Sequence, residues 1–494
     1  MDVIYESSRD KKKKKKGMDA ILEGLSSDGG LYVLHNLKSK RYPMKSLCKQ
    51  NYCEICETLL SLFFSEFDEV EIADMVHQAY ANKFDTDEIT PLVTLHDAYV
   101  VELFHGPTSA FKDIGLSVLP QLVCKALEKK QKPEKLLFLV ATSGDTGMAA
   151  LQGFKDVQHT NVIVFYPKAK TSLIQERQMR SAFADNVRVC AVEGNFDDAQ
   201  TGIKKLFQDE DFKERLNAKK QTMAFANSVN IGRLLPQLVY YFDAYAKLLR
   251  RGEIQENEAV NFVVPTGNFG NILAGYYAKQ LGLPIHKLIC ATNENNVLCD
   301  FFKTGEYDSN REFIKTNSPS MDILVSSNVE RLLYYASNQN HMYVKKCMMD
   351  LKQMGCYKIE PEVLANMQKD FLWGCANDQE TLDTIQKVYE NERYVLDPHT
   401  ATAYKVLLEN KDPQHKSIVL ATASPYKFAH DVLKAIAPLQ SIQDEFEAME
   451  YLYKKTKIPI PNNLQNLKLK PLRFYDVIQK EEMKAYILKV VEEF

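Results

Sequence analysis

From about residue 92 onward, short apolar runs alternate with stretches of helical periodicity, and this alternation limits the folds open to the chain. Helical stretches such as 116–130 and 231–251 lie between the runs. Strands that alternate with helices predict βαβ units, and continuous apolar strands predict sheets covered on both faces. The sequence therefore predicts an α/β protein with mainly parallel sheets. The predicted strands are LLFLVA (136–141), NVIVFYP (161–167), VRVCAV (187–192), VNFVVP (260–265), KLICAT (287–292) and SIVLATA (417–423).

The length of 494 residues corresponds to about three domains. Residues 1–95 have helical spacing and predict a mostly helical N-terminal domain. Residues 96–250 and 251–440 predict a smaller and a larger α/β lobe, and a cleft between two such lobes is a usual place for a small-molecule site. Residues 441–494 predict a helical C-terminal tail.

Composition and charge argue against several classes of partner. The formal net charge is −3 and no basic face is apparent, so no nucleic acid is expected as a partner. No apolar stretch reaches the length of a transmembrane helix, and the N-terminus has no run of signal-peptide length. We therefore expect a cytoplasmic protein without a membrane partner.

The cysteines and a run of lysines have ordinary interpretations. Cys53 and Cys56 form a C-x-x-C pair, but no second pair completes a zinc site, so no metal is expected. The ten cysteines are expected to be free thiols of a reducing compartment. The Lys11–Lys16 run has a nuclear signal or a lipid contact as alternatives, but six like charges favour a flexible, solvated loop.

Three loops directly follow predicted strands, where ligands collect in open α/β sheets. The first, TSGDTG at 142–147, offers backbone N–H groups and hydroxyls that suit a carboxylate or phosphate, with a plain helix cap as the alternative. The second, PTGNFGN at 265–271, has glycines that permit close approach of a phosphate, but no Rossmann or Walker pattern. The third, ATASP at 421–425, taken alone is an ordinary polar strand exit.

The stretch HGPTSAFKD at 105–113 places Lys112 after a turn, beside Phe111 and between apolar segments. A lysine that forms a Schiff base must be partly desolvated, which lowers its pKa. A cofactor that uses such a lysine and carries a phosphate is pyridoxal 5′-phosphate. The pattern alone leaves a solvated surface lysine as the commoner interpretation.

The order and wording of these loops resemble threonine synthases, in the form found in enteric bacteria and fungi. The similar stretches run from residue 20 to about 435, in the family's order. They include FHGPTSAFKD (104–113), ATSGDTG (141–147), YPKAKTSLIQERQM (166–179), NSVNIGRLLPQLVYYF (227–242), VPTGNFGNILAGYYAK (264–279), ATNENNVL (291–298), LDPHTATAY (396–404) and LATASPYKF (420–428).

The resemblance implies a fold of type II among pyridoxal-phosphate enzymes, similar to the tryptophan synthase β subunit, with Lys112 in the smaller lobe as the Schiff-base lysine. It implies that the cofactor phosphate is held by Gly267, Asn268, Phe269, Gly270 and Asn271. Thr422 would face the pyridine nitrogen. Asp145 would face the cofactor's hydroxyl side, in the loop where Ser143 and Thr146 hold the substrate carboxylate. The substrate's own phosphate would be bound by Asn227, Ser228, Asn230 and Arg233, with Lys168 or Lys170.

The resemblance also implies an activity, the conversion of O-phospho-L-homoserine and water to L-threonine and phosphate. Two alternatives remain open at this point: a phospho-lyase that releases 2-oxobutanoate, ammonia and phosphate from the same substrate, and a catalytically silent relative. A monomer is expected more than a homodimer.

Overall fold

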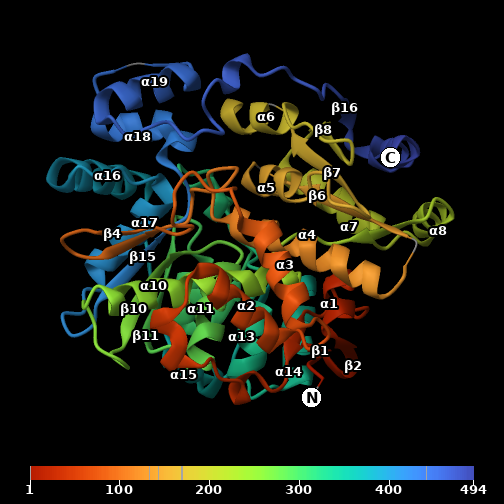
Figure 1. Ribbon diagram of the computed structural model, residues 1–494, viewed down its shortest axis with the longest axis horizontal. Helices are drawn as coiled ribbons and strands as arrows, with labels where there is room; N and C mark the ends of the chain where they lie inside the picture. The colour runs from red at the N-terminus through yellow and green to blue at the C-terminus, as the bar shows by residue number, and fades with distance from the viewer. Residues whose placement is uncertain (1, 133, 143, 169–170, 441) are drawn as a thin grey trace.

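The computed structural model describes residues 2–132, 134–142, 144–168, 171–440 and 442–494. Its framework is two sheets that lie side by side (Figure 1). All neighbouring strands in both sheets are parallel, except for the antiparallel pair at one edge of the larger sheet. The larger sheet has the order β14 (Phe371–Cys375), β11 (Ile285–Thr292), β10 (Val260–Pro265), β15 (Ser417–Ala421), β5 (Tyr99–Glu102) and β4 (Leu92–Thr94). The smaller has the order β16 (Val477–Gln479), β8 (Val187–Glu193), β7 (Thr160–Pro167), β6 (Lys135–Ala141) and β9 (Gln221–Ala224).

The predicted strands and the predicted cover on both faces are confirmed. All six apolar runs form strands, namely β6, β7, β8, β10, β11 and β15. In β10, Phe262 and Val264 lie in the same core as residues of α11 (Gly270–Gln280), while Val263 lies in a second core with residues of α17 (Pro398–Glu409). Successive side chains of a strand point to opposite faces, so α11 and α17 cover opposite faces of the larger sheet.

The helices connect and cover these strands. The long helix α4 (Lys112–Lys129) leads from the larger sheet to the smaller one and packs against α5 (Asp145–Gly153). The other α-helices beyond the N-terminal part are α6 (Leu173–Arg180), α7 (Phe196–Leu206), α8 (Glu210–Ala218), α9 (Ile231–Leu234), α10 (Val239–Arg250), α12 (Val297–Thr304), α13 (Val329–Ala336), α14 (His341–Met354), α15 (Pro361–Gln368), α16 (Asp378–Glu392), α18 (Ala429–Ile436), α19 (Glu445–Thr456) and α20 (Met483–Val490).

The N-terminal part begins with a small antiparallel sheet, in which β2 (Asp10–Lys16) and β3 (Tyr32–Leu34) flank β1 (Ile4–Ser7). The helices α1 (Gly17–Glu23), α2 (Tyr52–Phe63) and α3 (Glu69–Tyr80) follow. The prediction of a flexible loop at Lys11–Lys16 is therefore wrong. Strand pairing uses backbone groups, and the lysine side chains remain largely solvated on an edge strand, where lysine also opposes pairing with other chains.

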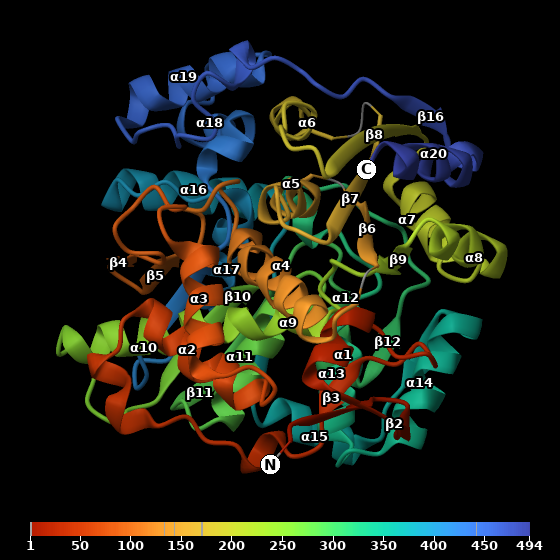
Figure 2. The same ribbon diagram turned by 45° about the vertical axis from the view of Figure 1, so that its right-hand side comes forward.

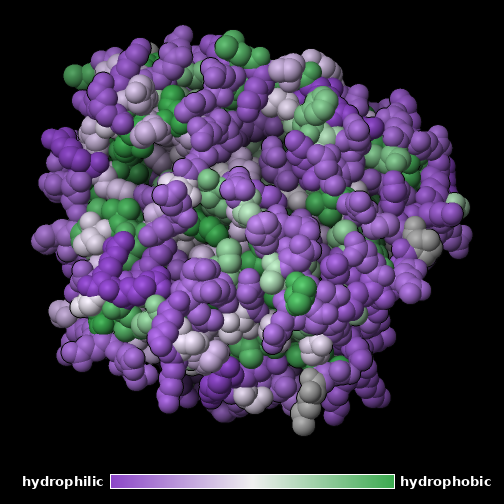
Figure 3. Space-filling model, viewed as in Figure 1, coloured by the Kyte–Doolittle hydropathy of each residue, from purple (hydrophilic) through white to green (hydrophobic). Residues whose placement is uncertain are grey.

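The C-terminal part of the chain returns to the smaller sheet. After α18 and α19 the chain runs to the smaller sheet, where residues 477–479 of the predicted helical tail form the edge strand β16 before α20 (Figure 2). The face shown in Figure 3 is mainly hydrophilic, with hydrophobic residues scattered across it. Across the described residues, no helix combines the length and the apolar character needed to cross a membrane.

Arg331 of α13 joins the N-terminal part to the rest of the molecule. Its guanidinium is fully buried and donates to the carbonyl oxygens of Tyr32 at 2.9 Å and Val229 at 2.6 Å, and to Asn328 Oδ1 at 2.5 Å. These acceptors lie in β3, in the loop before α9 and at the start of α13. One side chain thus fixes three segments that are distant in the sequence.

Replacing Arg331 with methionine should lower the free energy of unfolding by about 3 kcal/mol or more, because three buried acceptors lose their donor. Denaturant unfolding followed by circular dichroism measures the effect. Arg215→Met, at an exposed position of α8, is the control and should change stability little. Equal stability of the two variants would contradict the role of Arg331.

Candidate active site

The site forms where the carboxyl ends of β6, β10 and β15 meet the start of α4. The chain before α4 is pinned to the exit of β15, because the backbone N–H of Leu103 donates to Ala421 O and that of Phe111 donates to Thr422 O, each at 2.9 Å. This pairing brings Lys112, the first residue of α4, beside residues that follow it by more than 300 positions. Asp145 of the loop at 142–147 contacts Lys112 and Ser320, and Ser320 packs against Gly267 of the loop at 265–271, so the three loops named from the sequence converge.

Lys112 is drawn inward, with only 12% of its side chain exposed. Its Nζ lies 3.3 Å from Asp145 Oδ2 and 3.3 Å from Ser320 Oγ. Burial lowers the pKa of the Lys112 amine; Asp145 opposes this shift, and the charges of Lys427 and Arg233 add to it. A depressed pKa leaves more of the amine unprotonated, as a nucleophile or base requires.

Asp145 is the carboxylate that pairs with both buried lysines of the site, Lys112 and Lys427. Its Oδ1 accepts from Gln175 Nε2 at 2.7 Å and lies 2.5 Å from Lys427 Nζ, and the Lys427 side chain is fully buried. Although burial opposes ionisation, the ammonium groups of Lys427 and Lys112 hold the pKa of Asp145 well below its ordinary value. Two buried lysines therefore share one ionised carboxylate.

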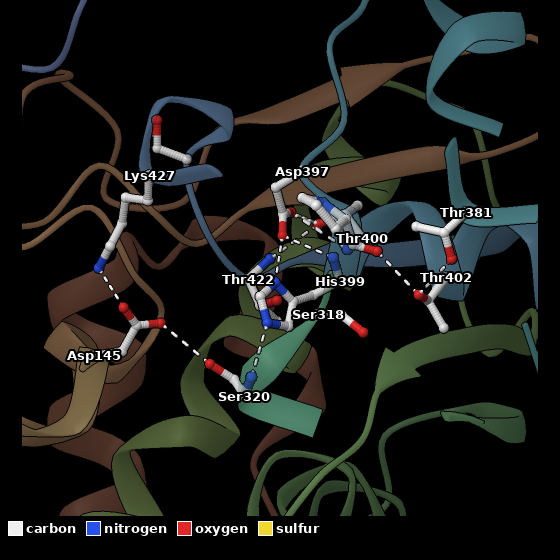
Figure 4. A network of polar contacts seen from close by, with 12 residues as sticks. Asp145, Ser318, Ser320, Thr381, Asp397, His399, Thr400, Thr402, Thr422 and Lys427 are labelled. Atoms are coloured by element: carbon white, nitrogen blue, oxygen red, sulfur yellow. Dashed lines mark hydrogen bonds and ion pairs between the residues drawn. The ribbon is translucent and has the colours of Figure 1, made fainter. Parts of the chain in front are cut away.

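A further chain of polar contacts runs from this carboxylate into α17 (Figure 4). Ser320 Oγ lies 3.3 Å from Asp145 Oδ2, and the Ser320 backbone N–H donates to His399 Nε2 at 3.1 Å. The other ring nitrogen of His399 lies 2.8 Å from Asp397 Oδ1. Asp397 also caps α17 and binds the hydroxyl of Thr400, whose Oγ1 accepts from the backbone N–H of Thr422 at 3.3 Å.

Several residues of this network were not identified from the sequence, although Asp397, His399 and Lys427 lie in the quoted stretches LDPHTATAY and LATASPYKF. The only local signal was Asp397 before Pro398, a pattern typical of a helix start. The missed residues are Gln175, Ser320, Asp397, His399 and Lys427.

The loop after β10 has the geometry of a phosphate cradle at the start of α11. Phe269 adopts a left-handed conformation with φ of 62°, directly before Gly270. At Gly267 a Cβ atom would lie 2.6 Å from the carbonyl oxygen of Ser320, so only glycine fits. Asn268 is held through its carbonyl oxygen, which accepts from Asn328 Nδ2 at 3.0 Å.

Asn271, in the first turn of α11, carries a buried donor that lacks a partner. Its Oδ1 accepts from the hydroxyls of Tyr240 at 2.6 Å and Tyr241 at 3.0 Å. Its Nδ2 is buried and has no hydrogen-bond partner within the described part of the chain. Buried polar atoms are rarely left unpaired, and this one lies at a helix N-terminus, where anions bind.

The loop after β6 is organised by Thr142, whose Oγ1 accepts from the backbone N–H groups of Gly144 at 2.9 Å and Gly147 at 3.0 Å. At Gly144 a Cβ atom would lie 2.3 Å from Gln175 Oε1. Thr146 is half-buried at the start of α5. Ser143 lies outside the described residues.

Arg233 is buried on α9, the short helix that follows the loop 227–230. Its Nη1 donates to Ala226 O at 2.9 Å, and it forms no ion pair with any residue that the structure describes. Burial lowers the pKa of Arg233 to about 10. The Arg331 guanidinium has three acceptors, whereas Arg233 has one carbonyl and no carboxylate, which is costly unless a ligand supplies further acceptors and the negative charge.

The remaining residues predicted for the substrate phosphate have different surroundings. Asn230 caps α9: its Oδ1 accepts from Gly232 N, and its Nδ2 donates to the carbonyls of Ile21 and Phe225, each at 2.9 Å. Asn227 is exposed, and Ser228 Oγ accepts from Asn328 Nδ2 at 3.2 Å. Lys168 is half-exposed and pairs with Glu193 at 2.7 Å, whereas Lys170 lies outside the described residues.

Comparisons with known proteins agree with this geometry. Three family models match in succession: "Threonine synthase N terminus" at residues 4–80, "Pyridoxal-phosphate dependent enzyme" at 85–346 and "Threonine synthase, C-terminal" at 400–487. Threonine synthase of Schizosaccharomyces pombe is 38% identical over an alignment of 453 residues that covers 85% of this chain and 86% of that protein. The chain belongs to the threonine synthase family.

Two further members of the threonine synthase family show the extent of the similarity. Threonine synthase-like 1 of Homo sapiens is 37% identical over an alignment of 450 residues that covers 88% of this chain but only 60% of that protein. The chain thus spans less than two thirds of the length of this relative. The crystal structure of pyridoxal-phosphate-bound threonine synthase from Brucella melitensis matches with a TM-score of 0.87 and 35% identity, covering 99% of this chain and 98% of that one.

The family's cofactor is pyridoxal phosphate, and the residues of this site fit it. Lys112 supplies a desolvated amine, and the glycine-lined loop before α11 supplies backbone donors for a phosphate. The unpaired Asn271 Nδ2 is a buried donor of the kind that such a ligand would satisfy.

Asn271→Asp should weaken pyridoxal phosphate binding at least about tenfold, because it removes a donor and adds a negative charge while keeping an acceptor for both tyrosine hydroxyls. Spectroscopic titration of the cofactor gives the dissociation constant. Gln280→Ala, at the other end of α11, is the control. An unchanged constant in Asn271→Asp would exclude Nδ2 as a cofactor ligand.

Proposed function

We propose that the protein is a threonine synthase, which converts O-phospho-L-homoserine and water to L-threonine and phosphate as a carbon–oxygen lyase. The observation that carries the proposal is the buried Arg233 guanidinium, unpaired within the described structure, whose charge acts on the buried Lys112 amine. An amino acid that bears its own phosphate matches this arrangement: its phosphate supplies the missing negative charge, and its α-carbon is directed to the amine.

The residues of the site support separate parts of this reaction. When bound, pyridoxal phosphate supplies an electron sink for the carbanion that forms at the substrate's α-carbon. The Lys112 amine is the base that takes the α-proton and then the β-proton, consistent with its lowered pKa. Arg233 binds the phosphate and stabilises it as it leaves the γ-carbon. Water then adds its hydroxyl at the β-carbon, and protons return to the α- and γ-carbons.

The surrounding residues would set the orientation of the reacting groups. The backbone of Thr422 is fixed by two hydrogen bonds: its carbonyl accepts from Phe111 N and its N–H donates to Thr400 Oγ1. Its side chain would place a neutral hydroxyl against the pyridine nitrogen. Asn230 would act through Arg233, because its polar atoms are occupied in capping α9. Thr146 and the backbone of the loop 142–147 would bind the substrate carboxylate, at the N-terminus of α5.

Lys112→Ala should abolish turnover and also the absorbance band that bound pyridoxal phosphate gives the wild-type protein. The product assay uses O-phospho-L-homoserine and measures threonine, phosphate and 2-oxobutanoate. Release of 2-oxobutanoate and ammonia in place of threonine would assign the protein as a phospho-lyase. Wild-type protein without the absorbance band after addition of cofactor would overturn the catalytic proposal as a whole.

Arg233→Met should lower kcat/KM for O-phospho-L-homoserine by about 100-fold or more, because a charge-assisted, bidentate phosphate contact is lost. The same variant should unfold at an equal or higher denaturant concentration, since it removes a buried charge without a carboxylate partner. Steady-state kinetics and denaturant unfolding test the two expectations, with Arg215→Met as the control. Destabilisation together with normal kinetics would show that Arg233 is structural.

We also propose a cytoplasmic, monomeric enzyme. All ten cysteines are free thiols, which is typical of a reducing compartment.

A further inference from the structure

His399 is a buried histidine without a role in the proposed chemistry, yet it contacts two parts of the site (Figure 4). Its side chain is 3% exposed, and its ring packs edge-on against Phe428. On one side Nδ1 lies 2.8 Å from Asp397 Oδ1, and on the other Nε2 lies 3.1 Å from the backbone nitrogen of Ser320. Both nitrogens are therefore occupied.

These contacts fix the tautomer of the neutral ring. A backbone N–H can only donate, so Nε2 must be an unprotonated acceptor for Ser320. The proton of the neutral ring is then on Nδ1, where it is donated to the carboxylate of Asp397. Asp397 is held in turn by the backbone N–H groups of His399 and Thr400, at 3.0 and 3.3 Å.

Ser320, whose backbone N–H donates to His399, lies against both the Lys112 amine and the loop 265–271, which we call the phosphate loop. Ser320 Oγ is 3.3 Å from Lys112 Nζ and 3.3 Å from Asp145 Oδ2, a geometry in which the hydroxyl donates to the carboxylate and accepts from the amine. The Ser320 carbonyl forms the wall against which Gly267 of the phosphate loop packs. Displacement of this peptide would disturb the amine and the loop together.

The short turn Pro319–Met321 is anchored at both ends, because Asn293 Nδ2 donates to Ser318 Oγ at 3.0 Å and to Asp322 Oδ1 at 2.8 Å, but the backbone at its centre has fewer contacts. Pro319 has no backbone N–H, and the N–H groups of Met321 and Asp322 bond back to Ser318 and Pro319 within the turn. Among the described residues, the backbone N–H of Ser320 donates only to His399. The imidazole is thus the contact that ties the centre of this turn to the larger sheet's helix α17.

We propose that His399, oriented by Asp397, is a positioning residue: as a neutral acceptor it fixes the Ser320 peptide, and through it the Lys112 amine and the phosphate loop. The inference rests on the proposed role of Lys112 as the cofactor lysine. It assigns to His399 no contact with the reacting atoms.

Two variants of similar size distinguish the hydrogen bond between Ser320 and His399 from simple packing of the side chain. A glutamine amide oxygen reaches the position of Nε2 and can accept from Ser320, whereas an asparagine side chain reaches only the position of Nδ1, near Asp397. His399→Gln should therefore bind pyridoxal phosphate within about threefold of wild type. His399→Asn should bind it about tenfold or more weakly, the effect of leaving one buried donor without an acceptor.

The measurements are spectroscopic titration of pyridoxal phosphate, kcat and KM for O-phospho-L-homoserine, and the melting temperature of each variant. We expect rescue by glutamine in the titration and in kcat, even where both variants melt at the same temperature. If the asparagine variant does not fold, His399→Leu replaces it: leucine fills the apolar part of the site but offers no acceptor to the Ser320 N–H, and it should weaken cofactor binding similarly.

Equal cofactor affinity in His399→Gln and His399→Asn would overturn the inference. Where His399→Asn does not fold, wild-type cofactor affinity in His399→Leu would overturn it. This outcome is distinct from failure of the proposed function. Failure of the function would appear in the wild-type protein itself, as absence of the cofactor band or of the expected products.

Discussion

The structure depends on one buried carboxylate that is shared by two lysines. Asp145 faces Lys427 at 2.5 Å and Lys112 at 3.3 Å, and the charge of Arg233 also acts on Lys112. Removing charged groups from water is costly, and Asp145 pairs directly with both lysines while Arg233 has no carboxylate partner among the described residues. The excess positive charge explains why the site suits a cofactor phosphate and a phosphorylated amino acid.

This charge cluster exists only because distant segments are brought into register. Lys112 comes from the start of α4, Asp145 from the start of α5, and Lys427 from the turn that follows β15. The backbone pairing of residues 103–111 with residues 421–424 sets their separation. Parallel strands place their carboxyl ends at one edge, so each connecting loop contributes to the same site.

The sequence predicted those parts of the fold that depend on local pattern. Continuous apolar runs predicted the six strands, and glycine and hydroxyl residues after them predicted the loops that form the site. Lys427 and His399 were missed because their significance lies in partners, Asp145 and Ser320, that only the tertiary structure places beside them. The run Lys11–Lys16 was misjudged because its side chains argue for solvation while its backbone is free to pair with β1.

Arg233 shows most clearly what burial adds to a sequence pattern. On a short helix that is capped by Asn230, an arginine would be assigned to the surface if no family resemblance were known. The structure instead buries it, gives it one carbonyl contact, and offers no carboxylate from the described residues. A protein selected for stability alone would not retain such a charge, because an apolar side chain of similar volume costs less to bury. A buried charge without a carboxylate partner thus favours a ligand with an anionic group, and this charge adds to the burial that lowers the pKa of the Lys112 amine.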